Sequence, residues 1–164
     1  MKIGVVSDTH GRLQITQKAI HLLRERGAEL ILHCGDIDSP TTVRLFSPIP
    51  SHFVFGNWDV PTAKLKSAIA QIGGVWHDEI GQLDVDGKRL AWVHGHVRGQ
   101  RQRLETSGDF DFLFYGHSHK AEVHRAGQTL VANPGALHRA KTKTVMLVDL
   151  ATGEWEPLVV DRQH

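Results

Sequence analysis

The stretch from Phe112 to His119 ends in two imidazoles that are one residue apart. Four apolar residues, FLFY, lead into Gly116, and His117 and His119 follow. Because imidazole nitrogens commonly bind divalent metal ions, this stretch could form part of a metal site at the end of a strand. A His-x-His pair is weak evidence by itself, since the chain has 12 histidines in 164 residues. A metal site would therefore need further ligands at the ends of other strands.

Polar residues of suitable types also follow four other apolar runs. Ligands of α/β proteins bind at the carboxyl ends of strands, so we expect these side chains to converge on one site. The candidate metal ligands are Asp8, His10, Asp36, Asn57, His94, His117 and His119. Residues two apart in an extended segment point to the same side. We therefore expect Asp8 with His10, and His117 with His119, each to reach the site as a pair.

The chemistry of this set favours two metal ions over one. Seven carboxylate, amide and imidazole groups are too many for a single tetrahedral zinc site, and the chain has no set of thiolates. Two ions about 3.5–4 Å apart would use them all if one carboxylate bridged the pair. Mixed nitrogen and oxygen ligands suit Mn²⁺, Zn²⁺, Fe or Ni²⁺. We expect two divalent metal ions, with Mn²⁺ preferred.

The first half of the chain is predicted to alternate strands with helices. Strands are expected at 3–6, 29–36 and 51–57, and helices at 13–27, 39–46 and 61–74. Gly27 is expected to end the first helix, and Ser39 and Pro40 have the residue types of an N-cap and a first helical position. This alternation predicts parallel strands joined by crossover helices.

The second half is predicted to be mainly β-structure. A hairpin is expected at 80–95, with Asp86–Gly87 as a type I′ turn. A helix is expected over 97–108, a strand over 111–119, and strand–turn–strand units over 121–136 and 143–160. The two halves together predict an α/β fold of two packed sheets flanked by helices, in one domain covering residues 1–164.

Composition and charge indicate an ordinary globular protein. The net charge is +1, which gives no strong nucleic-acid signal and no attraction to an anionic membrane. The single cysteine, Cys34, excludes an intramolecular disulfide. The apolar run at the N-terminus is too short for a signal peptide or a membrane span, so we expect a cytoplasmic protein. The hairpin edges could pair between copies, but the sequence leaves the oligomeric state open.

The ordered motifs SDTHG, HCGD, GNWD, VHGH, YGHSH and NPGA resemble those of the calcineurin-like metallophosphoesterase superfamily. The short length and the lack of long insertions resemble its small bacterial and archaeal phosphodiesterase branch. The match runs from Lys2 to about Ala136. The resemblance implies a four-layer α-β-β-α sandwich with two mixed sheets. It also implies a dinuclear metal-dependent phosphodiesterase acting on small or nucleotide-like phosphodiesters.

The resemblance also implies which residues hold each ion. The ligands of one ion would be Asp8, His10, Asp36 and His119. The ligands of the other ion would be Asp36, Asn57, His94 and His117, so Asp36 would bridge. A solvent-derived hydroxide between the ions would attack phosphorus in line, and Asn57 could donate its amide hydrogens to a phosphate oxygen.

The chain differs from the wider superfamily at Trp58. Many relatives have a histidine there, which contacts the phosphate or protonates the leaving group. An indole has one N–H donor and no proton to transfer near neutral pH, so His96 and His138 become candidates for the acid. Asp59 is expected to orient a ligand or the loop of Asn57. Asn57, Asp59 and His96 are thus the expected catalytic residues beside the ligands.

Several other polar residues have simpler interpretations. His33 and Cys34 lie in an apolar strand and are expected to be a hydrogen-bonded core histidine and a small buried thiol. Arg98 and Arg101, on one face of the predicted helix, could guide an anionic substrate or simply face solvent. Trp58 could stack on an aromatic ester or pack against its own loop.

Two other functions are compatible with the same motifs. The eukaryotic retromer subunit shares this fold and has an aromatic residue at the position of Trp58, so a binding module with little or no activity is one alternative. The complete set of ligands for two ions argues against it. The other alternative is a phosphomonoesterase, and the missing histidine at position 58 argues against that.

Overall fold

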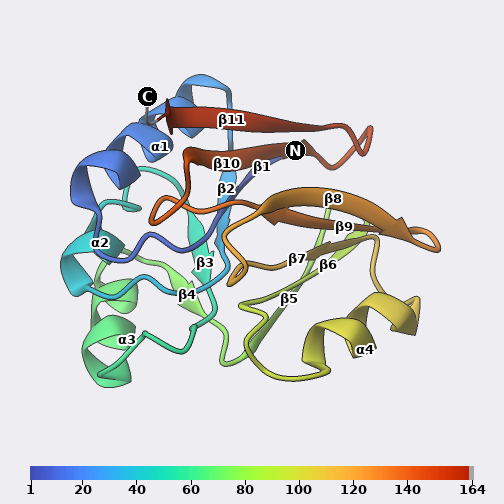
Figure 1. Cartoon of the computed structure of the whole chain (residues 1–164), viewed down its shortest axis with the longest axis horizontal. Coiled ribbons are helices and arrows are strands. Elements are labelled where there is room, and N and C mark those ends of the chain that lie inside the picture. Colours follow the sequence, from blue (N-terminus) through green and yellow to red (C-terminus); the bar gives the residue numbers. More distant parts are fainter. Residues whose placement is uncertain (163–164) are drawn as a thin grey trace.

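Two β-sheets lie face to face in the computed structural model, which describes residues 1–162 (Figure 1). The first sheet has the strand order β11-β10-β1-β2-β3-β4. Its strands are β1 (Lys2–Val6), β2 (Leu30–His33), β3 (Ser51–Phe53), β4 (Val75–Trp76), β10 (Thr142–Asp149) and β11 (Trp155–Arg162). Strands β1 to β4 are parallel, whereas β10 is antiparallel to both β1 and β11, so the sheet is mixed.

The second sheet is also mixed and has the order β5-β6-β7-β9-β8. Its strands are β5 (Ile80–Val85), β6 (Lys88–Val93), β7 (Phe112–Phe114), β8 (Ala121–Ala126) and β9 (Thr129–Pro134). Strands β6, β7 and β9 are parallel, and β5 and β8 form antiparallel edges. Asp86 and Gly87 both have positive φ between β5 and β6, as a type I′ turn requires, so the predicted hairpin is confirmed.

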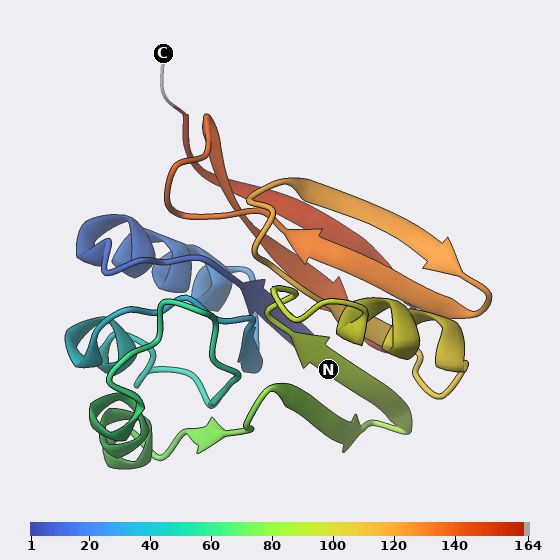
Figure 2. The same ribbon diagram turned by 60° about the horizontal axis from the view of Figure 1, so that its bottom comes forward.

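Helices cover the outer faces of the two sheets (Figure 2). They are α1 (Leu13–Glu25), α2 (Pro40–Arg44), α3 (Thr62–Gln71) and α4 (Gln100–Ser107). The first three lie on one side of the molecule and α4 on the other. The predicted cap of α2 is confirmed, because the backbone N–H of Thr42 donates to Ser39 Oγ at 3.2 Å.

Successive side chains of a strand point to opposite faces of its sheet, so each sheet packs against the other sheet on one face and against helices on the other. On β2, Leu30 and Leu32 face the second sheet, and Ile31 packs among the helices of the first. On β6 of the second sheet, Leu90 and Trp92 point into the space between the sheets. Neighbouring residues of β6 pack instead on the outer face with residues next to and within α4. The predicted four-layer α-β-β-α sandwich is therefore confirmed.

The strands differ from the prediction mainly at their carboxyl ends. Strands β2, β3 and β7 end at His33, Phe53 and Phe114, so the polar residues that follow them lie in loops. The short strand β4 was not predicted, because two residues carry no measurable periodicity. Among the described residues, no helix has the length and apolar character needed to cross a membrane.

The side chain of His33 lies in the core and forms hydrogen bonds with the loops that follow β1 and β2. The side chain is fully buried, and Nδ1 accepts the backbone N–H of Gly35 at 3.1 Å. The proton must therefore lie on Nε2, which is 3.2 Å from Thr9 Oγ1. Thr9 Oγ1 in turn donates to the carbonyl of Asp36 at 3.4 Å. The predicted hydrogen-bonded core histidine is confirmed.

Burial makes His33 a source of acid sensitivity. Desolvation lowers the pKa of His33 to about 3 from an ordinary 6.5. As the pH falls below 6.5, the unfolded chain binds a proton that the folded protein excludes, so stability that is present at neutral pH is lost. From pH 7 to pH 5 we expect this residue to remove about 2 kcal/mol from the free energy of unfolding.

Urea denaturation of metal-stripped protein at the two pH values measures this loss. His33→Asn keeps an acceptor for the Gly35 N–H, so its unfolding free energy should fall less than that of the wild type. His21→Asn is the matched control, because the His21 side chain is 60% exposed. Equal losses in the wild type and in His33→Asn would contradict the assignment.

Candidate metal centre

The candidate ligands lie on loops that follow the carboxyl ends of strands from both sheets. The loops after β1, β2 and β3 come from the first sheet, and those after β6 and β7 come from the second. Backbone hydrogen bonds join them within each sheet: Asp8 N–H donates to Gly35 O, and Gly116 N–H donates to His94 O, both at 3.0 Å. Between the sheets, the N–H of His117 donates to Asp8 Oδ2 at 3.1 Å.

The backbone at the site is left-handed rather than extended. Among residues 1–162, eight non-glycine residues have positive φ, and six of them are in these loops. The six are Asp8, His10, Asp36, Asp38, His117 and His119. The prediction of extended Asp-x-His and His-x-His segments is therefore wrong. Each left-handed residue reverses the chain direction within a short loop, at a cost of about 1 kcal/mol.

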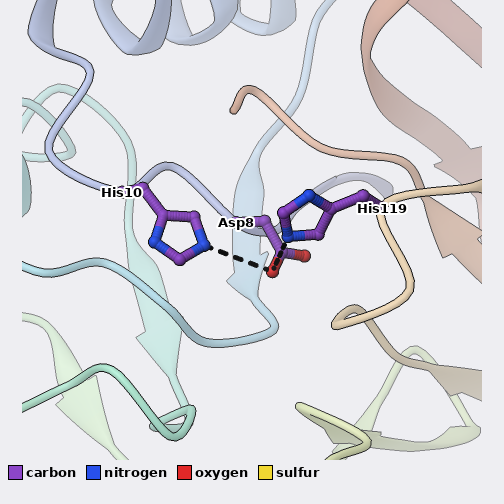
Figure 3. Close-up of side chains that lie close together, drawn as sticks. All are labelled: Asp8, His10 and His119. Atoms are coloured by element: carbon purple, nitrogen blue, oxygen red, sulfur yellow. Dashed lines mark ion pairs between the residues drawn. The ribbon is translucent and has the colours of Figure 1, made fainter. Parts of the chain in front are cut away.

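Asp8, His10 and His119 form the first group of donors (Figure 3). Asp8 Oδ1 lies 3.1 Å from His119 Nε2 and 3.8 Å from His10 Nε2. The other oxygen, Oδ2, accepts the Ser7 hydroxyl at 2.6 Å, which fixes the carboxylate orientation. Asp8 Oδ1 and His10 Nε2 are buried and make no hydrogen bond within residues 1–162. Buried polar atoms without partners fit a site that is completed by a cation.

Asp36, His94 and His117 form the second group. Asp36 Oδ2 lies 3.2 Å from His94 Nε2, which is itself 3.2 Å from His117 Nδ1. The same Asp36 oxygen is 3.3 Å from His10 Nε2 of the first group. Asp36 therefore faces both groups, whereas the adjacent histidines 117 and 119 separate into different ones. Both histidines thus reach the site, one in each group, which is the division of ligands that the resemblance implies.

Hydrogen bonds set the tautomers of two of these imidazoles. His94 Nδ1 lies 2.8 Å from the carbonyl of Cys34, so Nδ1 donates and the lone pair is on Nε2. His10 Nδ1 lies 3.1 Å from Asp38 Oδ2, which gives the same tautomer. A carboxylate behind a metal-binding imidazole is a common arrangement in metalloproteins. Asp38 was missed by sequence reasoning, although its place two residues after Asp36 was a usable signal.

The two carboxylates and the imidazoles shift one another's proton affinity. Burial opposes ionisation of Asp8, but His10 and His119 outweigh it and hold the pKa of Asp8 below its ordinary value. Burial likewise opposes the charged form of His94, and Asp36 reverses this and raises the pKa of His94. The site is thus a concentrated set of negative oxygens and basic nitrogens, the donor set that borderline divalent ions prefer.

Asp59 holds the loops and does not reach into the site. Its carboxylate is buried and accepts four backbone N–H groups at 2.7–2.9 Å. The donors are Asp36, Ile37, Asp38 and Gly56. Both oxygens are therefore occupied by the backbone of the two loops that follow β2 and β3.

Asn57 and His96 lie at the edge of the site and outside both groups. The Asn57 side chain is exposed, and the neighbouring Trp58 N–H donates to Asp36 Oδ1 at 3.0 Å. His96 is also exposed, with its ring centroid 5.3 Å from that of His94 and 6.3 Å from that of His117. His96 thus flanks the second group.

A cleft of about 430 Å³ opens over the donors. Trp58, which is 60% exposed, forms part of its wall, and His138 and Arg139 form another part. The His138 ring centroid lies 4.8 Å from that of His10, and His138 Nδ1 accepts a hydrogen bond from Arg12 Nε at 3.0 Å. Arg12 and Arg139 were not singled out by sequence reasoning, because their loops carry no recognisable motif.

Comparison with known proteins identifies the family. Residues 1–153 match the family model described as the calcineurin-like phosphoesterase superfamily domain. A phosphodiesterase of Methanocaldococcus jannaschii is 28% identical over 166 residues, which cover 98% of this chain and 100% of that protein. A probable metallophosphoesterase of Methanothermobacter thermautotrophicus is 30% identical over 145 residues, covering 83% of this chain and 77% of that protein.

Solved structures of phosphodiesterases are also similar to this chain. An archaeal phosphodiesterase superposes with a TM-score of 0.91 at 28% identity, covering 97% of this chain and 99% of that one. Vacuolar Protein Sorting 29 from Cryptosporidium parvum superposes with a TM-score of 0.66 at 18% identity, covering 96% and 95%, which shows a shared fold alone. Because the family model matches most of the chain, the protein belongs to the calcineurin-like phosphoesterase superfamily, a family of phosphoric ester hydrolases.

Proposed function

We propose that this chain is a dinuclear metal-dependent phosphodiesterase that hydrolyses small or nucleotide-like phosphodiesters. The observation that carries the proposal is the position of Asp36 Oδ2, which lies within 3.3 Å of imidazoles from both donor groups. A carboxylate in that place can bridge two ions. Relatives named phosphodiesterase, among them one that aligns with nearly the whole chain, support the diester as substrate.

In this proposal the residues that hold the ions follow from the two groups. Asp8, His10, Asp36 and His119 hold one ion. Asp36, Asn57, His94 and His117 hold the other. When bound, Mn²⁺ or a similar ion would supply a water-derived nucleophile for in-line attack on phosphorus and would screen the phosphoryl oxygens. Mn²⁺, Zn²⁺, Fe and Ni²⁺ all suit these donors.

The residues around the cleft bind and orient the ester. His138 accepts a hydrogen bond from Arg12 at Nδ1, so its proton is on Nε2. His138 is therefore suited to donate a hydrogen bond to a phosphoryl oxygen rather than to transfer a proton. His96, beside the second group, remains the candidate that protonates the leaving group. The exposed ring of Trp58 offers an apolar face to the second ester group.

The likeness to Vacuolar Protein Sorting 29 and the exposed pair Trp58 and Val60 favour one alternative, a binding module with little activity. Metal analysis separates the two functions. An enzyme of the proposed kind holds two ions per chain and turns over a diester. Folded protein that hydrolyses no phosphodiester with Mn²⁺, Ni²⁺, Co²⁺ or Zn²⁺ would leave the binding module as the better description.

Asp36→Asn should abolish turnover while leaving the fold intact. The amide keeps an oxygen for the Trp58 N–H but removes the negative charge shared by the two ions. We expect hydrolysis of bis(p-nitrophenyl) phosphate with Mn²⁺ to fall about 100-fold or more. Metal analysis should show fewer than two ions per chain. Asp84→Asn, at an exposed position on β5, is the control. This variant should keep both the turnover and the two bound ions of the wild type. An active Asp36→Asn variant would remove Asp36 from its role.

The enzyme should prefer diesters to monoesters that have the same leaving group. Trp58 gives the second ester group an apolar surface and offers no positive charge to a monoester dianion. We expect kcat/KM for bis(p-nitrophenyl) phosphate to exceed that for p-nitrophenyl phosphate about tenfold, and Trp58→Ala to reduce the ratio. A ratio below one in the wild type would favour a phosphomonoesterase.

His96→Gln should lower kcat substantially only for esters whose leaving group must be protonated. Alkoxides are poor leaving groups unless protonated, whereas p-nitrophenolate leaves without help. We expect kcat to fall by about 10- to 100-fold for a dialkyl phosphate and by less than about threefold for bis(p-nitrophenyl) phosphate. Equal losses with both esters would assign His96 a structural role instead.

A further inference from the structure

A second cleft, of about 770 Å³, adjoins the cleft over the metal centre. The two share Gly11, Arg12, His138 and Arg139, so they form one continuous groove. The second cleft extends from the shared residues over the start of α1 to Lys143 on β10 and Asp161 on β11. A substrate held at the metal centre can therefore reach into it.

Positive charge dominates the walls of this second cleft. Within residues 1–162, its charged lining consists of Arg12, Arg139 and Lys143 and one carboxylate, Asp161. Arg12 uses Nε to contact His138, which leaves its other guanidinium N–H groups available. Arginine donors arranged in this way suit the oxygens of a phosphate. The first backbone N–H groups of α1, where Arg12 provides no side-chain cap, add a further weak attraction for anions.

Lys143 is the least exposed of the three cationic side chains in this cleft. Its side chain is only 12% exposed, and Nζ is shielded from solvent without a hydrogen-bond partner in residues 1–162. Nζ forms an ion pair with Asp161 Oδ2 at 3.6 Å, a separation beyond hydrogen-bonding distance. The ion pair offsets the charge of the ammonium but leaves it without a hydrogen-bond acceptor, and an oxyanion in the cleft would supply one.

We infer that the second cleft binds a second anionic group of the substrate, a phosphate set several bonds away from the diester that is cleaved. This inference rests on the proposed function and narrows its substrate class to phosphodiesters that also carry a separate phosphate. The metal centre cleaves the diester, and the cationic cleft selects molecules with the additional charge. Arg139 lies between the two clefts and contributes to both.

The selectivity can be measured with two chromogenic diesters that differ in one group. These are propyl p-nitrophenyl phosphate and the analogue that carries a phosphate on the terminal carbon of the propyl group, assayed at fixed ionic strength; neither has a free hydroxyl that could attack phosphorus internally. We expect the phosphorylated diester to have the higher kcat/KM. In Lys143→Gln the ratio of the two kcat/KM values should fall about tenfold, as expected for one lost charge-assisted hydrogen bond.

Two variants control this experiment. Lys141→Gln removes an exposed lysine that does not line the cleft, and should leave the ratio unchanged. Asp161→Asn removes the competing carboxylate and should raise the ratio, a change opposite in sign to that of Lys143→Gln. An unchanged ratio in both cleft variants, with the unphosphorylated diester still hydrolysed, would overturn the inference and leave the phosphodiesterase intact.

A binding measurement keeps the inference testable if no diester is hydrolysed. Protein stripped of metals on a chelating resin is titrated calorimetrically with inorganic tripolyphosphate. We expect binding that weakens at least about fivefold in Lys143→Gln and is unchanged in Lys141→Gln. Equal affinities in wild type and Lys143→Gln would overturn the anion site. Loss of activity with anion binding retained would instead reject only the proposed reaction.

Discussion

The buried carboxylate of Asp59 is the interaction on which the geometry of the site depends. Four backbone N–H groups from two loops converge on its two oxygens at 2.7–2.9 Å. Charge-assisted hydrogen bonds of this kind are about twice as strong as neutral ones, so the loops after β2 and β3 are held as one unit. Asp36 then faces both donor groups, and Asp38 lies behind His10. The metal-binding geometry is thus set by a residue that contacts no donor side chain in either group.

This arrangement is maintained at a cost in backbone energy. Left-handed aspartates and histidines are less favourable than extended ones, and six of them occur in the loops of the site. Glycines are required where chains approach each other: a Cβ on Gly35 would lie 2.8 Å from both Gly56 N and His94 Nδ1. Close packing of the loops brings ligands from two sheets together, and the core between the sheets holds the strands that carry them.

The continuous groove links the reaction to the choice of substrate. The donors at its centre are oxygens and nitrogens suited to divalent ions, and its outer part is cationic. In the proposed function, an ester with one charge uses only the centre, whereas a molecule with a second phosphate uses the whole length. The outer part is formed by the start of α1, the loop after β9 and the last two strands. These segments lie largely outside the ligand motifs.

The sequence by itself determined the types of the elements, the layered fold and the residues at the ends of the strands, because hydrophobic periodicity and turn residues are local properties. Spacing alone could not separate His117 from His119, since their division between the two groups depends on left-handed backbone angles that the loops adopt only when packed. Only the resemblance to a known family implied that division. Sequence reasoning also missed Asp38, Arg12, Arg139 and Lys143. Their roles arise from contacts between distant segments, and only the tertiary structure brings those segments together.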